Sequence, residues 1–248
     1  MNDLLKIIHQ KKNELDLLRP LPLEFIKNLD DWFKVESTYN SNAIEGNTLS
    51  KQETTLIIEK GITIGGKSLK EHLEATNLAF AIDYIKKITN KRKQRINLKD
   101  ILNLHYLILK KIDDKNAGKL RNIAVKIAGS DSILPDPLKL SGLMDDFIKR
   151  LHSVDEDIIK IAADAHLKLL LIHPFVDGNG RTARLLMDLL LMQKGFPPAI
   201  IKVEDRLVYI KSISKAERTG NNSDYYQIIF NAVDKSLDIY LELAEKSK

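Results

Sequence analysis

The chain has 248 residues, which is long enough to bury the core of one large domain. It contains 44% hydrophobic and 29% charged residues, as globular proteins do, and no cysteine, which excludes disulfides, thiolate chemistry and cysteine zinc sites. Its 39 basic and 34 acidic residues give a net charge of +5 without a long basic block, so the charge pattern does not favour a nucleic-acid partner.

Neither a membrane span nor a targeting signal is predicted. No apolar run has the length of a membrane-spanning helix. Residues 1–16 scatter lysines and acidic residues where a signal peptide would carry an apolar core. We therefore expect a cytoplasmic protein without a membrane partner.

The chain is predicted to begin with two helices, over 4–18 and 23–36, separated by Arg19-Pro20-Leu21-Pro22. Residues 37–47 are then predicted to contain a helix end at Gly46, with Glu45 in the last turn. A carboxylate is unfavourable at the negative end of a helix dipole. We therefore expect a cationic group to face Glu45.

Residues 61–68 match the P-loop pattern, with the sequence Gly-Ile-Thr-Ile-Gly-Gly-Lys-Ser. A P-loop follows a buried strand, whereas here a capping box of Ser50 and Glu53 predicts a helix. A P-loop NTPase is therefore kept only as a remote alternative.

The next predicted helices cover 68–88 and 98–111. The basic stretch 86–99 lacks interleaved aromatic residues, which favours a solvated loop over a surface for an acidic partner. His105, on the second of these helices, is interpreted as a packing residue.

A β-hairpin is predicted within 118–137, where the apolar pattern changes from helical to alternating. Ile123, Val125 and Ile127 fall on one side of the first strand, Gly129-Ser130 forms the turn, and 133–137 returns. It is the only hairpin predicted, so the fold class is all-α with one short hairpin.

Further helices are predicted over 138–152 and 156–172, from 205 onward, and over 223–246. Ser153 and Glu156 are expected to cap the second of these helices. His166, which lies on the same helix, is interpreted as a core residue.

The most informative stretch is 173–184, with the sequence His-Pro-Phe-Val-Asp-Gly-Asn-Gly-Arg-Thr-Ala-Arg. Long apolar runs flank it, so it is predicted to be the turn between two buried helices, the second running from about Asn179 to Gly195. The free N–H groups at the start of that second helix form an anion site, and phosphate is the usual occupant.

The side chains of this turn suit phosphate chemistry. Arg181 and Arg184 are neighbours on one helix face and could clamp phosphate oxygens bidentately. Asp177 could hold Mg²⁺, which shares carboxylate and phosphate oxygens. His173 is the one side chain here that can be neutral and basic near neutral pH. The glycines on either side of Asn179 let the backbone come close to a ligand.

The stretch also matches, at every specified position, the signature His-Pro-Phe-x-Asp/Glu-Gly-Asn-Gly-Arg-x-x-Arg, and the chain thereby resembles the Fic (Fic/Doc) family. The resemblance implies an all-α Fic-type fold in which the hairpin over 121–137 is a flap that docks the target protein as an added strand. It also implies an N-terminal helical extension, 1–36, and a Fic-like catalytic domain, 37–248, that includes an inhibitory segment, 37–47.

By this resemblance, the chain is expected to be a protein adenylyltransferase. It would move AMP from ATP, with Mg²⁺, to a hydroxyl of an unidentified target protein or of itself, with His173 as the base and Asp177 as the metal ligand. Glu217 stands where the family often has asparagine. The nucleotide-binding residues would be Gly178, Asn179, Gly180, Arg181, Arg184 and Tyr209, the last lining the adenine pocket.

Ser41, Glu45 and Gly46 resemble the inhibitory motif of the family, in which the glutamate would pair with Arg184 and block the place of the γ-phosphate. Several alternatives stay open: Glu45 positioning a water that removes AMP, another nucleotide or phosphocholine donor, and a degenerate binding module. Whether two copies associate to stabilise the inhibited state is also left open.

Overall fold

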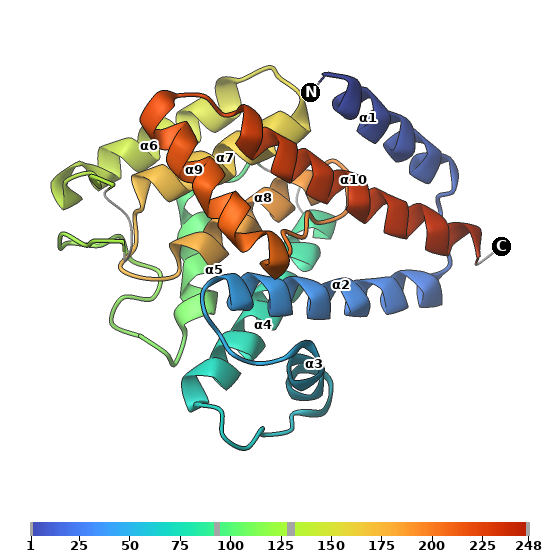
Figure 1. Cartoon of the computed structure of the whole chain (residues 1–248), viewed down its shortest axis with the longest axis horizontal. Coiled ribbons are helices and arrows are strands. Elements are labelled where there is room, and N and C mark those ends of the chain that lie inside the picture. Colours follow the sequence, from blue (N-terminus) through green and yellow to red (C-terminus); the bar gives the residue numbers. More distant parts are fainter. Residues whose placement is uncertain (1, 92–94, 128–131, 247–248) are drawn as a thin grey trace.

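A computed structural model describes residues 2–91, 95–127 and 132–246. These residues form helices joined by turns and loops, with no strand among them (Figure 1). The helices are α1 (Asn2–Leu17), α2 (Leu23–Ile44), α3 (Lys51–Lys60), α4 (Leu69–Lys91), α5 (Leu98–Leu109), η1 (Pro137–Lys139), α6 (Leu140–Ser153), α7 (Ile158–Ile172), α8 (Asn179–Gln193), η2 (Val203–Asp205), α9 (Arg206–Thr219) and α10 (Ser223–Glu245).

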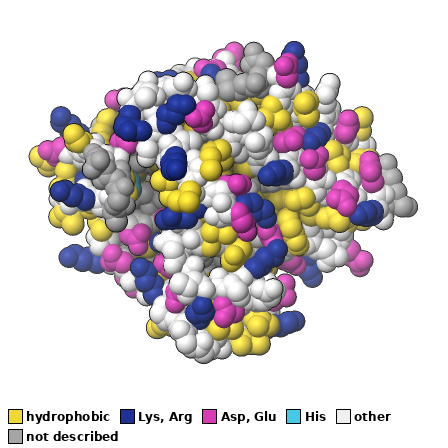
Figure 2. Space-filling view, in the orientation of Figure 1, with side chains coloured by type: hydrophobic (Ala, Val, Ile, Leu, Met, Phe, Trp, Pro, Cys, Tyr) yellow, Lys and Arg dark blue, Asp and Glu magenta, His cyan; other side chains and the backbone are white. Residues whose placement is uncertain are grey.

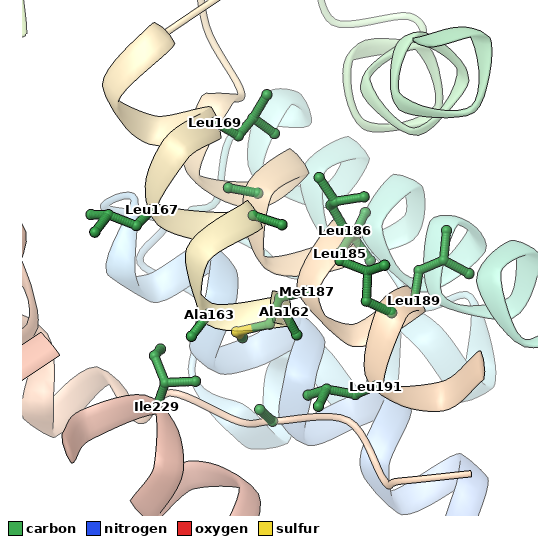
Figure 3. Close-up of a cluster of buried hydrophobic side chains, with 14 of the residues drawn as sticks. Ala162, Ala163, Leu167, Leu169, Leu185, Leu186, Met187, Leu189, Leu191 and Ile229 are labelled. Atoms are coloured by element: carbon green, nitrogen blue, oxygen red, sulfur yellow. The ribbon is translucent and has the colours of Figure 1, made fainter. Parts of the chain in front are cut away.

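The centre of the molecule is the pair α7 and α8, whose apolar side chains meet in Figure 3. Helix α8 is apolar around most of its circumference, so it has to be surrounded by other helices, and α4, α5 and α7 pack against it. Leu186, Met187 and Leu189 are fully buried there. The turn that joins α7 to α8 is therefore held between two anchored helix ends.

Helix α2 is one continuous helix that passes residue 36 and ends at Ile44, so Glu45 is its C-cap residue and Gly46 follows at φ +98°. Three polar contacts at four-residue spacing tie α2 to the segment around η2, and this spacing places them on one helix face. They join Glu36 to Lys202 (2.5 Å), the Val203 N–H to Asn40 (3.0 Å), and Arg206 Nε to the Ile44 carbonyl (2.7 Å). These contacts fix the position of the helix end that carries Glu45.

The P-loop interpretation of 61–68 is contradicted. The residues before it form α3, which ends at Gly61 in the left-handed conformation, rather than a buried strand. Lys67 turns back and donates from Nζ to the Thr48 carbonyl at 2.6 Å. The glycines of this segment therefore belong to a helix-to-helix connection.

The β-hairpin predicted over 121–137 is not confirmed. Residues 121–127 and 132–136 form no strand, and the predicted Gly129-Ser130 turn lies outside the described residues. A buried arginine takes the place of the backbone hydrogen bonds that would pair two strands. Arg121 donates to the carbonyls of Ile123 at 3.0 Å and Pro135 at 2.7 Å. The two arms of the segment are thus held together by a guanidinium rather than by backbone pairing.

Other boundaries shift slightly. Asp157, not Ser153 with Glu156, caps α7, because its carboxylate accepts from the Ile159 N–H at 2.8 Å. The basic stretch is partly helical, since residues 86–91 complete α4, and residues 92–94 lie outside the described part. In Figure 2, basic and acidic side chains are interspersed over the visible face. Within the described residues no helix is long and apolar enough to cross a membrane.

Candidate active site

The turn between α7 and α8 is held by its backbone conformation and by one side chain. His173 ends α7 in the left-handed conformation (φ +48°), and Gly178, also left-handed (φ +76°), begins α8. The Asn179 side chain closes the loop between them, because it accepts from the Phe175 N–H at 3.0 Å and donates to the Phe175 carbonyl at 2.9 Å. Asn179 is therefore committed to shaping the turn.

His105 of α5 packs against the turn and hydrogen-bonds to its backbone. Its ring stacks on Phe175 at 3.7 Å between ring centres, and burial lowers its pKa to about 4, so it is neutral. Nδ1 accepts from the Gly118 N–H at 3.0 Å, which leaves Nε2–H to donate to the Asp177 carbonyl at 3.0 Å. The packing role predicted from the sequence is present, but His105 also fixes a carbonyl of the turn.

His173 is half-buried, and its environment keeps it neutral. Burial lowers the pKa of His173, and the charge of Arg121 adds to this, although the backbone of Leu170 and the carboxylate of Glu45 oppose it. The backbone carbonyl of His173 accepts from Arg121 Nε at 2.9 Å. The Arg121 guanidinium thus joins the 121–137 segment to the candidate base. The sequence did not predict this connection.

Asp177 is the exposed carboxylate of the turn, with half of its side chain (50%) accessible. Its Oδ1 accepts from the Gly178 N–H at 2.6 Å, and within the described residues Oδ2 makes no hydrogen bond. These residues hold no cluster of three acidic or histidine side chains that could bind a metal alone. Asp177 therefore fits Mg²⁺ only where further oxygen ligands, such as phosphate oxygens, complete the shell.

Arg181 lies beneath the turn and is almost fully buried. Its Nη1 is 3.1 Å from Glu74 of α4, and its Nη2 is 3.5 Å from Asp177. Nε has no hydrogen-bond partner within the described residues, and Nη1 is close to Glu74 without the geometry of a hydrogen bond, so this arginine keeps free buried donors. Glu74 also accepts from Asn47 at 2.9 Å. No pattern in the sequence pointed to Glu74.

Arg184 meets the end of α2. It donates from Nε to the Ser41 hydroxyl at 2.8 Å, from Nη2 to the Ser41 carbonyl at 3.0 Å, and from Nη2 to Glu45 Oε1 at 2.6 Å. Burial lowers the pKa of Arg184, but the charge of Glu45 and its hydrogen bond, together with Tyr209, raise it by more, so the net pKa is raised. The cation expected opposite Glu45 is therefore Arg184.

The Glu45 carboxylate also lies against the backbone of Gly180. A Cβ placed on Gly180 would overlap Glu45 Oε1, so only glycine leaves room for the carboxylate there. Gly178 at the N-cap provides no side-chain cap for α8. Asp177 accepts from the Gly178 N–H, but no side chain caps the amides that follow, and Glu45 lies next to them. Gly46, at φ +98°, turns the chain directly after Glu45.

Tyr209 of α9 is buried, and its hydroxyl lies 2.9 Å from His166 Nε2. A role in lining an adenine pocket stays a prediction. Glu217, further along α9, accepts from the Ser132 hydroxyl at 2.6 Å and so contacts the 121–137 segment.

Comparison with known proteins gives a consistent family. The family model described as Fic/DOC family matches residues 95–191. "Protein adenylyltransferase Fic" of Nematostella vectensis is 38% identical over 206 residues, which are 82% of this chain and 48% of that protein. The protein of the same name from Aedes aegypti is 39% identical over 210 residues, 84% of this chain and 42% of its own. The chain thus spans about half the length of the curated relatives it matches.

Solved structures agree with the sequence comparison. The structure of Fic-1 from C. elegans superposes with a TM-score of 0.88 at 31% identity, covering 100% of this chain and 74% of that one. A Fic domain containing signaling protein from Bacteroides thetaiotaomicron gives a TM-score of 0.87 at 26% identity, covering 97% of this chain and 98% of that one. The likeness therefore extends beyond the α7–α8 turn to the whole helical arrangement.

Proposed function

The chain belongs to the Fic/DOC family, and we propose that it is a protein adenylyltransferase, which moves AMP from ATP to a hydroxyl side chain of a target protein. Relatives that carry this name match over most of the chain. The observation that supports the proposal best is the α7–α8 turn with the first turn of α8, which together carry a neutral histidine, two buried arginines and a helix N-terminus without a side-chain cap.

In the proposed reaction, His173 accepts the proton of the target hydroxyl. The hydroxyl oxygen forms a bond to the α-phosphorus of ATP, the bond from that phosphorus to the bridging oxygen breaks, and pyrophosphate leaves. Transfers of this kind depend mainly on positioning and on stabilising negative charge. Arg181, Arg184 and the first N–H groups of α8 supply donors for this, and Arg181 Nε is a buried donor without a partner in the described residues.

Asp177 is the residue that would hold Mg²⁺ together with the ATP phosphates. Bound there, Mg²⁺ would neutralise phosphate charge. Half of the Asp177 side chain is accessible, although its Oδ1 also accepts from Arg181 Nη2 at 3.5 Å.

We further propose that Glu45 inhibits the enzyme. Its carboxylate occupies Arg184 and lies over Gly180, beside the free amides of α8, where a phosphate would otherwise bind. An anion already in this position excludes a second one. The Ser41 contacts and the polar contacts of α2 with the η2 region hold the inhibitory glutamate in place.

The target protein is proposed to dock beside the 121–137 segment, which Arg121 joins to the candidate base. An extended target could pair with its backbone as a flap. Residues 1–36 are proposed as an N-terminal extension of the catalytic domain, and a cytoplasmic location and modification of the chain itself are proposed as well.

Intact mass spectrometry after incubation with ATP and Mg²⁺ tests the function, with self-modification as the readout. We expect one AMP on Glu45→Gly, little on the wild type, and none on Glu45→Gly/His173→Ala. The same adduct on the double variant would remove His173 as the base. Adducts only from other nucleoside triphosphates or a phosphocholine donor would assign a different transfer.

A further inference from the structure

Three buried side chains beneath Arg184 take no direct part in the proposed reaction. His166 of α7 and Tyr225 of α10 are fully buried, and Tyr209 of α9 is nearly so. They come from three different helices and contact one another through polar atoms. Buried polar groups of this kind are costly unless each hydrogen bond is made.

The direction of each hydrogen bond in this group is determined. The Tyr225 hydroxyl donates to the Ala163 carbonyl at 2.8 Å, since a carbonyl can only accept. Its oxygen, 2.6 Å from His166 Nδ1, must then accept, so Nδ1 carries the proton. Burial, and to a smaller extent Arg184, lowers the pKa of His166 to about 3, so the ring is neutral and Nε2 is bare.

The remaining step leads to Arg184. Because His166 Nε2 is bare, the Tyr209 hydroxyl donates its proton to it at 2.9 Å. The Tyr209 oxygen is then left with lone pairs only. Burial raises the pKa of Tyr209 to about 12, and the charge of the Arg184 guanidinium nearby partly opposes this.

We propose that His166 is a positioning residue for nucleotide binding: it takes the Tyr209 proton, so that the Tyr209 oxygen accepts from Arg184 and aims its guanidinium at the phosphate place. The inference rests on the proposed role of Arg184 in binding ATP. It assigns a function to a histidine that helical spacing alone marks as a core residue. The term relay below means Tyr225, His166 and Tyr209 together.

A neutral acceptor has a particular advantage at this place. The other acidic group near Arg184 on its own helix, Asp188, is buried, and its pKa is raised to about 8, so its carboxyl is largely protonated at neutral pH. Glu45 is thus the anion that faces the guanidinium in the described structure. When Glu45 leaves, Arg184 stays oriented by the relay and by Ser41, but its charge is left uncompensated for a phosphate.

The relay can be tested without any nucleotide. Long-range ¹H–¹⁵N correlation spectra of wild-type protein at neutral pH report which nitrogen of His166 is protonated, and His166→Gln identifies the signal. We expect the Nδ1–H tautomer. A His166 protonated at Nε2 could not accept from Tyr209 and would overturn the proposal, whatever the enzyme's activity.

The functional consequence is tested by calorimetric binding of ATP and of AMP in the Glu45→Gly background. His166→Leu should weaken ATP binding about tenfold, the effect of losing one good hydrogen bond to a charged group. AMP lacks the outer phosphates and should bind as before. His166→Gln, whose amide oxygen can accept from Tyr209, should recover most of the loss.

Tyr226→Phe is the matched control. Tyr226 is the neighbour of Tyr225 on α10, is buried, and donates its hydroxyl to Asp164 at 2.5 Å, outside the relay. We expect it to leave ATP binding unchanged.

Tyr209→Phe removes the hydroxyl oxygen that would accept from Arg184, with almost no change of volume. Its effect on ATP binding should equal that of His166→Leu, and combining the two substitutions should cause no further loss. Equal losses for ATP and AMP, or unchanged ATP binding in both variants, would reduce His166 to a packing residue. If Glu45→Gly bound no ATP at all, the proposed function would fail, and the tautomer would still decide the relay.

Discussion

Two glycine-rich segments of this chain match phosphate-binding patterns, and the structure uses them differently. Residues 61–68 join α3 to α4 at the edge of the molecule, below α2 in Figure 1. The turn between α7 and α8 joins two central helices. Each segment is followed by the N-terminus of a long helix, so the helix dipole alone does not distinguish them.

The difference lies in what already occupies each helix N-terminus. At α4, Glu71 accepts from the Ser68 N–H at 2.9 Å, and Lys67 is turned toward Thr48, so the donors are satisfied within the chain. At α8, Asp177 accepts from the Gly178 N–H, but no side chain caps the amides that follow, and the acid that lies beside them comes from a distant helix end, Glu45. A phosphate site therefore requires donors that their own sequence neighbours leave free.

The largest expected effect is at the base. His173→Ala in the Glu45→Gly background should lower kcat for AMP transfer on the order of a thousandfold, because general-base catalysis contributes about that much. Initial rates of self-modification measure it. The control is His105→Gln, which alters the turn from below and should cost less. A His173→Ala rate within a few-fold of its parent would remove the proposed base.

The second effect separates the two glycine segments directly. Arg184→Ala should weaken ATP binding about a hundredfold in the Glu45→Gly background, as expected when a buried, hydrogen-bonded charge is removed. Lys67→Ala should leave ATP binding unchanged, since its ammonium bonds to Thr48. Titration calorimetry of both variants is sufficient. The opposite ranking would revive the P-loop interpretation.

The third prediction is that Gly180→Ala changes the free energy of unfolding in opposite directions with and without Glu45. In wild type, Gly180→Ala should reduce the free energy of unfolding, because the new Cβ overlaps Glu45 and breaks its bond to Arg184. In the Glu45→Gly background the same substitution should gain up to about 1 kcal/mol, since alanine favours the helix. Urea unfolding of wild type, the two single variants and the double variant measures the coupling energy between Gly180→Ala and Glu45→Gly. Additive effects would show that the carboxylate does not lie over Gly180.

The smallest effect concerns Glu71 at the start of α4. Hydrogen bonds from the Thr48 hydroxyl, and from the Ser68 and Thr48 N–H groups, lower the pKa of Glu71 to about 2. The Glu71 carboxylate therefore contributes fully to the free energy of unfolding above its ordinary pKa of about 4.3. This contribution is lost as the pH falls toward about 2. Glu71→Ala should cost about 1 kcal/mol at pH 7, and the difference should shrink at acid pH.

Thermal unfolding of Glu71→Ala at several pH values checks this, with Glu242→Gln as the control. Glu242 forms an exposed pair with Lys246, which is worth little in water. A cost at Glu71 that does not change with pH would mean that its charge is not involved.

Local patterns predicted those parts of the fold that depend on neighbours in sequence. Apolar spacing located the helices, and Ser50 with Glu53 marked the start of α3 as a capping box. The turn after α7 was recognised because its glycines, asparagine and arginines lie within twelve consecutive positions, 173–184.

What the sequence could not supply were partners from distant segments. Glu74 for Arg181, and Arg121 for the His173 carbonyl, are separated from them by long stretches of chain and match no short pattern. The alternation over 121–127 predicted a strand, but the Arg121 side chain binds the Ile123 carbonyl there and joins it to the Pro135 carbonyl. His166 showed the spacing of a core residue, and only the positions of Tyr209 and Tyr225 reveal its polar role.

The central claim is that Glu45 and the outer phosphates of ATP compete for Arg184 and the N-terminus of α8. Its most direct test is the affinity of wild type and Glu45→Gly for ATP and for AMP, measured by titration calorimetry in the presence of Mg²⁺. We predict that Glu45→Gly binds ATP at least about tenfold more tightly than wild type, because a charged hydrogen-bond partner no longer has to be displaced. AMP should bind the two proteins equally. Equal affinity of both proteins for ATP would contradict the claim.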